Sequence, residues 1–293
     1  MVPKTKNRRS KRKRTSTKNN NNSISKKEPP PTNSKRNKIE ETEKKTQRNQ
    51  RNQQLLNEQL LIHAQQNELE EVKRDLEQGA DLNHVNEARQ SIAYIAAAVS
   101  NLDILRLLSK HTHLQSIDGP LGAFPQHIAA DNGHLDALRI LVQSEGAPQN
   151  QQTNGGRTPL YMSAQSNQAN CVHFLLTDPS SKADVLQHDI NQVTPLAIAC
   201  QLGCYDAVKL LVNHVKPDLL EKMLRVSDCA GYTPLHTAAW AGNRDIVQLL
   251  MEKGGDPTAR NYNDQSPMDI CEDMTVRHML AGRVYINVNH FLP

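Results

Sequence analysis

The chain is 293 residues long, which is enough for one large domain or two modest ones. It contains only three Phe, six Tyr and one Trp, so a core built from aromatic side chains is excluded and Leu, Ala, Ile and Val must provide the packing. Its five cysteines are odd in number, scattered and free of any CxxC pair, which indicates a reducing compartment and argues against a disulfide framework.

The hydropathy of the chain argues against a membrane protein or a secreted one. The longest apolar run lies near 92–99 and is far shorter than the roughly 20 residues that a bilayer-spanning helix needs. The basic N-terminus lacks the apolar segment that signal peptides carry. We therefore expect no membrane association.

Charge divides the chain into a basic tail and an acidic body. Residues 1–51 hold 18 Lys and Arg against 4 acidic residues, a net charge of +14, whereas the remainder holds 17 basic and 27 acidic residues, a net charge of −10. Residues 1–50 have almost nothing to bury, so we predict a disordered basic tail there. Residues 39–54 lack Pro and Gly and carry Glu and Lys at helical spacing, which favours a fraying helix that leads into the folded part.

A short segment recurs along the rest of the chain, and its copies start 33, 34, 36, 39 and 33 residues apart. An earlier unit at 60–83 fits the same spacing. The six clearest copies are SIAYIAA (91–97), FPQHIAA (124–130), TPLYMSA (158–164), TPLAIAC (194–200), TPLHTAA (233–239) and SPMDICE (266–272).

Each copy predicts the same pair of helices. A Thr or Ser is suited to cap a first helix, and the Pro after it tolerates the first helical position. A small pair such as Ala238–Ala239 lets neighbouring helices approach closely, and a Gly or Asn then ends the helix. A second helix follows with apolar residues at helical spacing, as at 246–250, and a Gly closes it.

These units resemble ankyrin repeats, in which TPLHxAA, a turn Gly, an apolar helix and GAD recur about every 33 residues. The resemblance covers about residues 55–281. It implies an all-α ankyrin-repeat solenoid of paired antiparallel helices with β-hairpin-like loops, and places six or seven repeats over residues 51–281. The longer spacings indicate insertions near 177–190 and 213–228, the second of which has enough Leu and Met for added helical turns. Residues 282–293 form a C-terminal extension that the pattern leaves unassigned.

The histidines are predicted to be structural. His127 and His236 occupy the fourth position of the TPLH segment, where the resemblance implies an imidazole bonded to backbone groups of its own or the adjoining repeat. Other repeats have Tyr, Ala or Asp there, so no ring of histidines faces a common centre. His111 and His113 stand two residues apart but lack further ligands at a suitable spacing, which disfavours a metal site.

The sequence carries no recognisable catalytic motif. It lacks a nucleophile elbow, an HExxH pair, a phosphate-binding loop and a dinucleotide fingerprint. Cys200 and Cys204 are four residues apart, but Cys200 replaces the second Ala of its repeat, which is typical of a packing residue. We therefore predict a protein with no enzymatic activity, no cofactor and no metal.

The resemblance also implies a binding surface. In ankyrin-like stacks the first helices and hairpin tips line a concave face, and the fold does not dictate the side chains there. By position, this face takes the two residues before each turn and the residue before each N-cap. The candidate partner-binding residues are Val99, Asp131, Asn132, Arg157, Gln165, Leu202, Tyr232 and Trp240.

Trp240 has two interpretations. It is either an anchor for a partner, since Trp and Tyr are enriched at binding hot spots, or a residue that lies against a neighbouring repeat. The position of Tyr232, which we expect near Trp240, slightly favours the anchor.

The basic tail has three interpretations. Lys11, Arg12, Lys13 and Arg14 form a block that resembles a nuclear-import signal. Such blocks also bind nucleic acid nonspecifically, and a charge run is sometimes only solubilising. With no aromatic residue among residues 1–50, any nucleic-acid contact would involve phosphates and depend steeply on salt.

These observations predict a non-catalytic adaptor or regulator that binds a partner protein through its concave face. We expect a monomer located in the nucleus and the cytoplasm. The acidic repeat body favours a partner with a basic patch. The alternative is a chromatin- or RNA-associated factor that holds nucleic acid with its tail and recruits a protein with its repeats. A third interpretation is a direct inhibitor of an enzyme or transcription factor.

Overall fold

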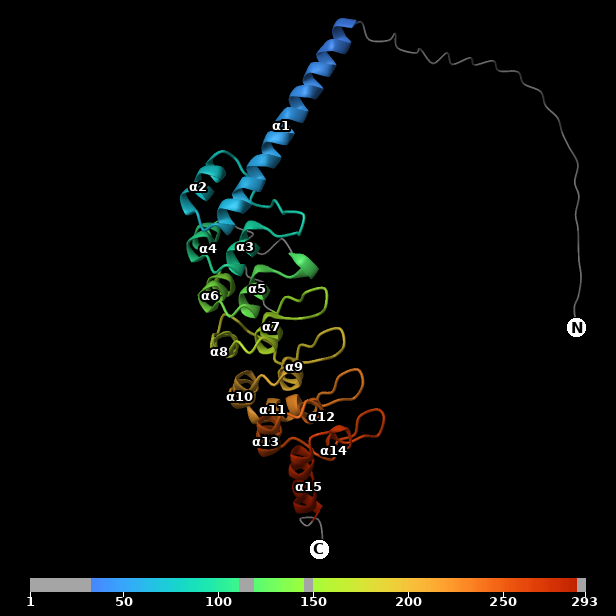
Figure 1. Cartoon of the computed structure of the whole chain (residues 1–293). Helices are drawn as coiled ribbons and strands as arrows, with labels where there is room; N and C mark the ends of the chain where they lie inside the picture. The colour runs from blue at the N-terminus through green and yellow to red at the C-terminus, as the bar shows by residue number, and fades with distance from the viewer. Residues whose placement is uncertain (1–32, 111–118, 145–149, 289–293) are drawn as a thin grey trace, which may run out of the picture. The chain divides into compact units, whose positions relative to one another are not determined.

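The computed structural model describes residues 33–110, 119–144 and 150–288. In these ranges the chain forms α-helices α1–α15, one short 3₁₀ helix, η1 (Pro120–Gly122), and an isolated β-bridge between Val85 and Ser91 (Figure 1). This architecture confirms the predicted all-α class. The chain divides into two compact units, Met1–Asn49 and Gln50–Pro293, and the repeats lie in the second.

Seven helix pairs follow one another along the second unit. The first helices of these pairs are the end of α1 (Asn33–Gln65), α3 (Ile92–Ala98), α5 (Pro125–Asp131), α7 (Pro159–Gln165), α9 (Pro195–Leu202), α12 (Pro234–Trp240) and α14 (Pro267–Ile270). The second helices are α2 (Leu69–Glu77), α4 (Leu102–Leu108), α6 (Leu135–Gln143), α8 (Ala169–Thr177), α10 (Tyr205–Asn213), α13 (Arg244–Glu252) and α15 (Met274–Val288).

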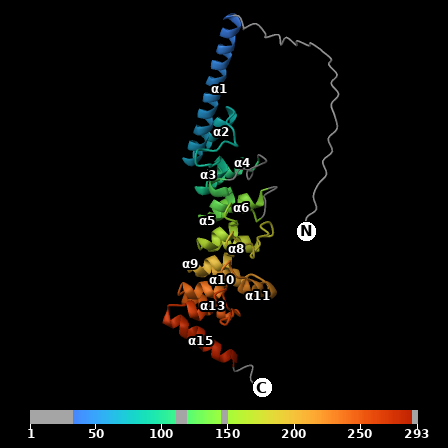
Figure 2. The same ribbon diagram turned by 90° about the vertical axis from the view of Figure 1, so that its right-hand side faces the viewer.

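Neighbouring pairs contact each other through like helices. From α3 to α14, each first helix packs on the next first helix, and from α2 to α15 each second helix packs on the next second helix. Two columns of helices result, and the loops that join the repeats project on the side of the first helices (Figures 1 and 2). Each repeat therefore buries its apolar residues against its neighbours, as solenoids do.

The helix α1 begins at Asn33, so residues 33–50, which we assign to the tail, are helical. The helix predicted over 39–54 lies inside α1 and continues without a break into the first repeat. Residues 1–32 lie outside the described part of the chain.

Two further helices lie where the repeat pattern is irregular. The insertion predicted near 213–228 contains α11 (Pro217–Arg225), which buries Met223 and Leu224 and packs on α12. The helix α15 continues past residue 281 to Val288, so the first part of the C-terminal extension is helical as well.

The first helices α7, α9 and α12 begin as the TPLH segment predicts. The hydroxyl oxygens of Thr158, Thr194 and Thr233 accept the backbone N–H three residues further on, at 3.2, 3.2 and 3.5 Å. Pro occupies the first helical position in all three helices, where its missing N–H leaves no hydrogen bond unmade.

The middle of five first helices, α3, α5, α7, α9 and α12, carries two small residues with no exposed surface, and their size lets the backbones of neighbouring helices approach closely. Cys200 belongs to this set, as predicted for a packing residue, and its burial raises the pKa of its thiol. The pairs are Ala96–Ala97, Ala129–Ala130, Ser163–Ala164, Ala199–Cys200 and Ala238–Ala239.

His127 ties its repeat to the next one, as predicted. Its Nδ1 accepts the backbone N–H of Phe124 at 3.0 Å, so Nε2 carries the proton. Nε2 donates to the carbonyls of Gln151 and Arg157 in the following repeat, at 2.9 and 3.1 Å. Burial outweighs these bonds and lowers the pKa of His127 from its ordinary 6.5 to about 4, so the ring is neutral in the fold.

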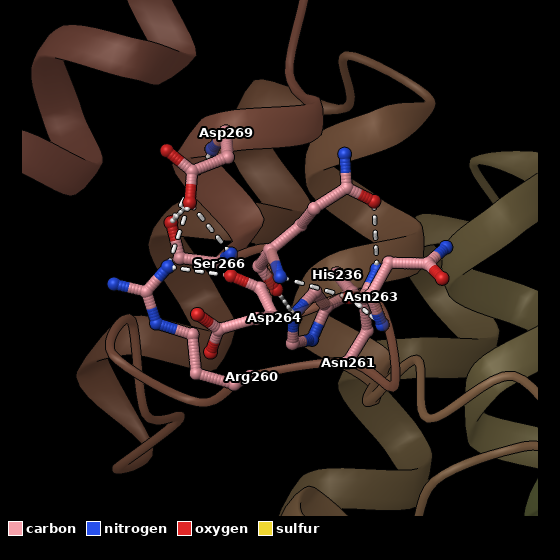
Figure 3. A network of polar contacts seen from close by, with 8 residues as sticks. His236, Arg260, Asn261, Asn263, Asp264, Ser266 and Asp269 are labelled. Atoms are coloured by element: carbon pink, nitrogen blue, oxygen red, sulfur yellow. Dashed lines mark hydrogen bonds and ion pairs between the residues drawn. The ribbon is translucent and has the colours of Figure 1, made fainter.

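His236 repeats the arrangement one step further along the stack (Figure 3). The backbone N–H of Thr233 donates to Nδ1 at 3.2 Å, and Nε2 donates to the carbonyl of Gln265 at 3.0 Å. Burial again lowers the pKa of the imidazole. In the last repeat Asp269 takes the equivalent position, where its carboxylate accepts the N–H of Ser266 at 2.8 Å and pairs with Arg260 at 3.0 Å (Figure 3).

The loops that join the repeats contain five-residue hairpin turns of one design. The N–H of the first residue donates to the carbonyl of the fifth, as in Thr153–Arg157, Asp189–Val193 and Asp228–Tyr232. The first residue is Thr, Asp or Asn in these and two further turns, and its side-chain oxygen accepts the N–H of the fifth residue. Short polar side chains stabilise turns in this way.

Successive hairpins are joined by single main-chain hydrogen bonds of 3.0 or 3.1 Å, which form a ladder. Each bond runs from the N–H of the second residue of one hairpin to the carbonyl of the third residue of the hairpin before it. The bonds join Asn154 to Leu121, Ile190 to Gly155, Cys229 to Asn191 and Tyr262 to Ala230.

The ladder stops at the hairpin Gly119–Ala123. Its second residue is Pro120, which has no N–H to donate to the preceding hairpin, Asn86–Gln90. Gly119 instead lies over the ring of Tyr94, where an added Cβ would come within 2.6 Å of a ring carbon. Packing on the side chain of Tyr94 therefore replaces the main-chain bond at this junction.

We expect the ladder to protect its amide hydrogens from exchange with solvent. The amides of Ile190, Cys229 and Tyr262 lie at loop positions whose side chains are exposed, yet each N–H is bonded to the neighbouring hairpin. NMR hydrogen exchange should show these three amides protected well beyond the rates of unstructured peptides. Exchange at unstructured rates would contradict the ladder.

We expect the free energy of unfolding to fall as the pH drops from 6.5 towards 4. Between pH 6.5 and 4, His127 takes up a proton in the unfolded chain but stays neutral in the folded chain, so protonation stabilises the unfolded state. The stabilisation that neutral His127 gives the fold above pH 6.5 is therefore lost as the pH falls towards its folded pKa of about 4. The contribution of His127 is on the order of 3 kcal/mol. Urea denaturation at pH 7 and 4.5 should show a smaller pH dependence for His127→Gln than for the wild type; equal losses would contradict the assignment.

Candidate protein-binding surface

The positions of the eight predicted partner-binding residues define a surface that we call the inner face. It consists of the C-terminal ends of the first helices and the last residues of the hairpins. Val99, Leu202 and Trp240, at the ends of α3, α9 and α12, are 47, 54 and 61% exposed. Asp131, Gln165, Gln201 and Trp240 stand seven residues after the N-caps of α5, α7, α9 and α12, because the N-cap fixes where each of these helices starts.

Trp240 and Tyr232 line one hollow on the inner face. This hollow has a volume of about 310 Å³, and we call it the Trp240 hollow; its lining residues are Gln201, Asp228, Tyr232, Thr237 and Trp240. The expected proximity of the two aromatic residues is therefore present. The exposure of Trp240 favours its interpretation as a recognition residue over burial against a neighbouring repeat.

The walls of the Trp240 hollow are held by the hairpin and by a buried histidine. The Asp228 Oδ1 atom accepts the N–H groups of Ala230 and Tyr232, both at 2.9 Å, and so fixes the turn. The Tyr232 ring packs edge-on against His236, with ring centroids 5.8 Å apart. Because the imidazole is itself bonded on both sides, the ring of Tyr232 has a rigid support.

A second hollow, of about 460 Å³, lies further along the same face between α5, α7 and their hairpins. Arg157 and Asp131 line it together with apolar side chains such as Ile128 and Met162. The Arg157 guanidinium carbon lies 5.5 Å from the centre of the Tyr161 ring, so this aromatic ring already has a cation. Burial, with the nearby Asp189 carboxylate, raises the pKa of Tyr161 to about 12.

Three of the predicted residues also form hydrogen bonds between repeats. Asn132 donates its side-chain amide to the carbonyl of Ala98 at 3.1 Å, and Asp131 accepts the hydroxyl of Ser166 at 2.5 Å. Gln165 is half-buried, and its carbonyl accepts the thiol of a neighbouring repeat. These residues are therefore less free for a partner than Val99, Leu202 and Trp240.

Sequence reasoning missed several residues of this surface. Asp228 and Thr237 line the Trp240 hollow, yet one belongs to the hairpin and the other lies four residues after the N-cap. The four-residue spacing from Asp228 to the predicted Tyr232 is a signal that identifies the hairpin. Leu121, Ile190 and Tyr262 at the hairpin tips are also well exposed.

The sequence also offers candidate metal ligands, apolar helices and a basic block. Among the described residues, no group of three His, Cys, Asp or Glu side chains is placed to share a metal ion. In the same part of the chain, every helix is too short or too polar to cross a membrane. His111, His113 and the block Lys11–Arg14 lie outside the described residues.

A family model described as ankyrin repeats, in three copies, matches residues 60–142, 112–189 and 180–261. The ankyrin repeat domain of Bcl-3, a member of the IkappaB protein family, superposes with a TM-score of 0.66 at 23% identity, over 76% of this chain and 98% of that domain. This likeness shows the fold.

Curated relatives share part of the sequence. NF-kappa-B inhibitor alpha of Rattus norvegicus is 29% identical over 166 residues, which cover 52% of each chain. Palmitoyltransferase AKR1 of Lachancea kluyveri is 27% identical over 227 residues, 76% of this chain and 30% of its own. The chain spans about half or less of the length of the curated relatives it matches. Because the family model matches more than half of the sequence and the helix pairs repeat its pattern, the chain belongs to the ankyrin repeat family.

Proposed function

We propose that this chain is a non-catalytic adaptor or regulator that binds a partner protein through its inner face, with the Trp240 hollow at the centre of the contact. Ankyrin repeats are in general modules for protein–protein interaction. The observation that carries the proposal is the exposure of Trp240, the single Trp of the chain, beside Tyr232.

A large aromatic side chain exposed to water is unfavourable unless a partner covers it, since burying such a residue is worth several times the thermal energy. Trp and Tyr in partly formed pockets are the residues that most often dominate binding energy. The repeat pattern does not require an aromatic residue at this position, because Gln165 and Gln201 occupy it in the two preceding repeats.

The charge of the repeats supports a partner with a basic patch. The chain after residue 51 has a net charge of −10, and Asp228 stands at the Trp240 hollow. Complementary charge accelerates encounter and disfavours acidic competitors. The name of NF-kappa-B inhibitor alpha agrees with a regulatory role, whereas the activity named for the palmitoyltransferase belongs to a protein of which only 30% is matched.

Replacing Trp240 or Tyr232 with Ala should remove partner proteins from the set captured by the full chain. Truncation of a hot-spot aromatic costs about 2 kcal/mol or more, which is roughly a thirtyfold loss of affinity. Affinity purification with mass spectrometry measures the partner set. Tyr205→Ala, an exposed aromatic at the start of the second helix α10, is the matched control and should keep the set. A folded Trp240→Ala variant with unchanged partners would overturn the proposal.

We propose further that the basic tail directs the protein to the nucleus. The support is the block from Lys11 to Arg14 within a segment of net charge +14. Replacing these four residues with Ala should lower the nuclear share of a fluorescent fusion several-fold, as seen by microscopy. Contact with nucleic acid is the alternative use of the tail, since the same charges neutralise phosphates. Unchanged localisation together with loss of retention on a nucleic-acid column would favour that alternative.

A further inference from the structure

We propose that the Trp240 hollow receives a cationic side chain, Lys or Arg, of the partner protein. This inference rests on the proposed function, because it assigns a chemical class to the group that the inner face binds. It is carried by the combination of two aromatic rings and one carboxylate around a single space.

The aromatic rings of the Trp240 hollow are without a cation of their own. Across the described residues, Arg157 lies over Tyr161 and Arg139 lies over Phe174, at 5.5 and 5.1 Å from the ring centres. No such pair in that part of the chain involves Trp240 or Tyr232, and no Lys or Arg lines the hollow. A cation placed against the face of Trp gains the strongest of the cation–π attractions.

One oxygen of the Asp228 carboxylate is held by the hairpin, and the other is available to a partner. Its Oδ1 atom is held by the N–H groups of Ala230 and Tyr232. Within the described residues, the hydrogen bonds to this carboxylate all go to Oδ1, and no hydrogen bond or ion pair engages Oδ2. A carboxylate that the fold already orients loses little freedom when it pairs with an incoming ammonium or guanidinium group.

The charge of Asp228 decides between the classes of side chain that would fit. An apolar side chain would cover the aromatic rings but would also take the carboxylate out of water without a partner, which is costly. An acidic side chain would meet a like charge. A basic side chain satisfies the rings and the carboxylate together, and Gln201 and Thr237 offer further polar groups at the rim.

The fluorescence of Trp240 measures binding at the hollow, because Trp240 is the only Trp in the chain and its emission responds directly to an occupant there. The full-length protein is titrated with the peptide acetyl-Ala-Ala-Arg-Ala-Ala-amide and with matched peptides that carry Lys, citrulline or Glu in place of Arg. Citrulline keeps the shape of Arg without its charge. We expect saturable changes in emission with the Arg and Lys peptides, at roughly millimolar Kd for a single side chain.

We expect the citrulline peptide to bind at least about tenfold more weakly than the Arg peptide, because it loses both the cation–π attraction and the ion pair. Added salt should weaken the binding of the Arg peptide and leave the binding of the citrulline peptide unchanged. Equal Kd values for Arg and citrulline, or binding of the Glu peptide as tight as that of Arg, would overturn the assignment.

The variant Asp228→Asn isolates the carboxylate. Asn occupies the same place in the hairpins Asn86–Gln90 and Asn261–Gln265, where its side-chain oxygen holds the turn, so the variant keeps the loop. The variant should bind the Arg peptide about fivefold more weakly than the wild type does, and its affinity for the citrulline peptide should be unaffected. An unchanged Kd for the Arg peptide would remove Asp228 from the site and overturn the proposal.

The peptide titration and the capture of partners test the two proposals separately. If Trp240→Ala abolishes partner capture while Arg and citrulline peptides bind equally, the protein-binding function stands and the cationic specificity is wrong. If the Arg peptide binds selectively but Trp240→Ala captures the same partners as the wild type, the hollow has the stated specificity and the proposed function of the inner face is wrong.

Discussion

The close approach of neighbouring first helices is the constraint on which the structure depends. Two small buried residues in each of α3, α5, α7, α9 and α12, such as Ala238–Ala239, remove the side-chain bulk that would hold the backbones apart. This contact fixes the angle and position of these five helices relative to one another. The N-cap then fixes where each helix begins, so residues such as Trp240 and Gln201 reach equivalent points on the inner face.

The sequence predicted those parts of the fold that depend on local chemistry. The Thr–Pro starts, the small pairs and the buried histidines follow from the preferences of single residues in a repeated frame, and the insertion with α11 follows from its Leu and Met spacing. The full length of α1 was not predicted, because the sequence carries no periodic apolar signal between Asn33 and Gln50. The extension of α15 to Val288 likewise lies outside the repeat pattern.

The candidate site was only partly predictable for a different reason. Trp240 and Tyr232 were found because repeat position alone places them on the inner face. Asp228 was missed, since its distance from Trp240 depends on how the hairpin folds back over the next first helix. Likewise, the bonds from Asn132 to Ala98 and from Ser166 to Asp131 join different repeats, so one repeat's pattern does not reveal them.

Pro120 marks the junction at which the coupling between neighbouring repeats is weaker than in the rest of the stack. In a nearest-neighbour array, the coupling between adjacent units determines whether they unfold together. From the hairpin at Gly119 onwards, every junction has both helix packing and a main-chain bond between hairpins, whereas the junction before it has helix packing and the Gly119–Tyr94 contact. The five C-terminal repeats therefore form the more strongly coupled block. Both hollows of the inner face lie within that block, apart from Tyr94 at its edge, so opening of the first two repeats leaves the Trp240 hollow intact.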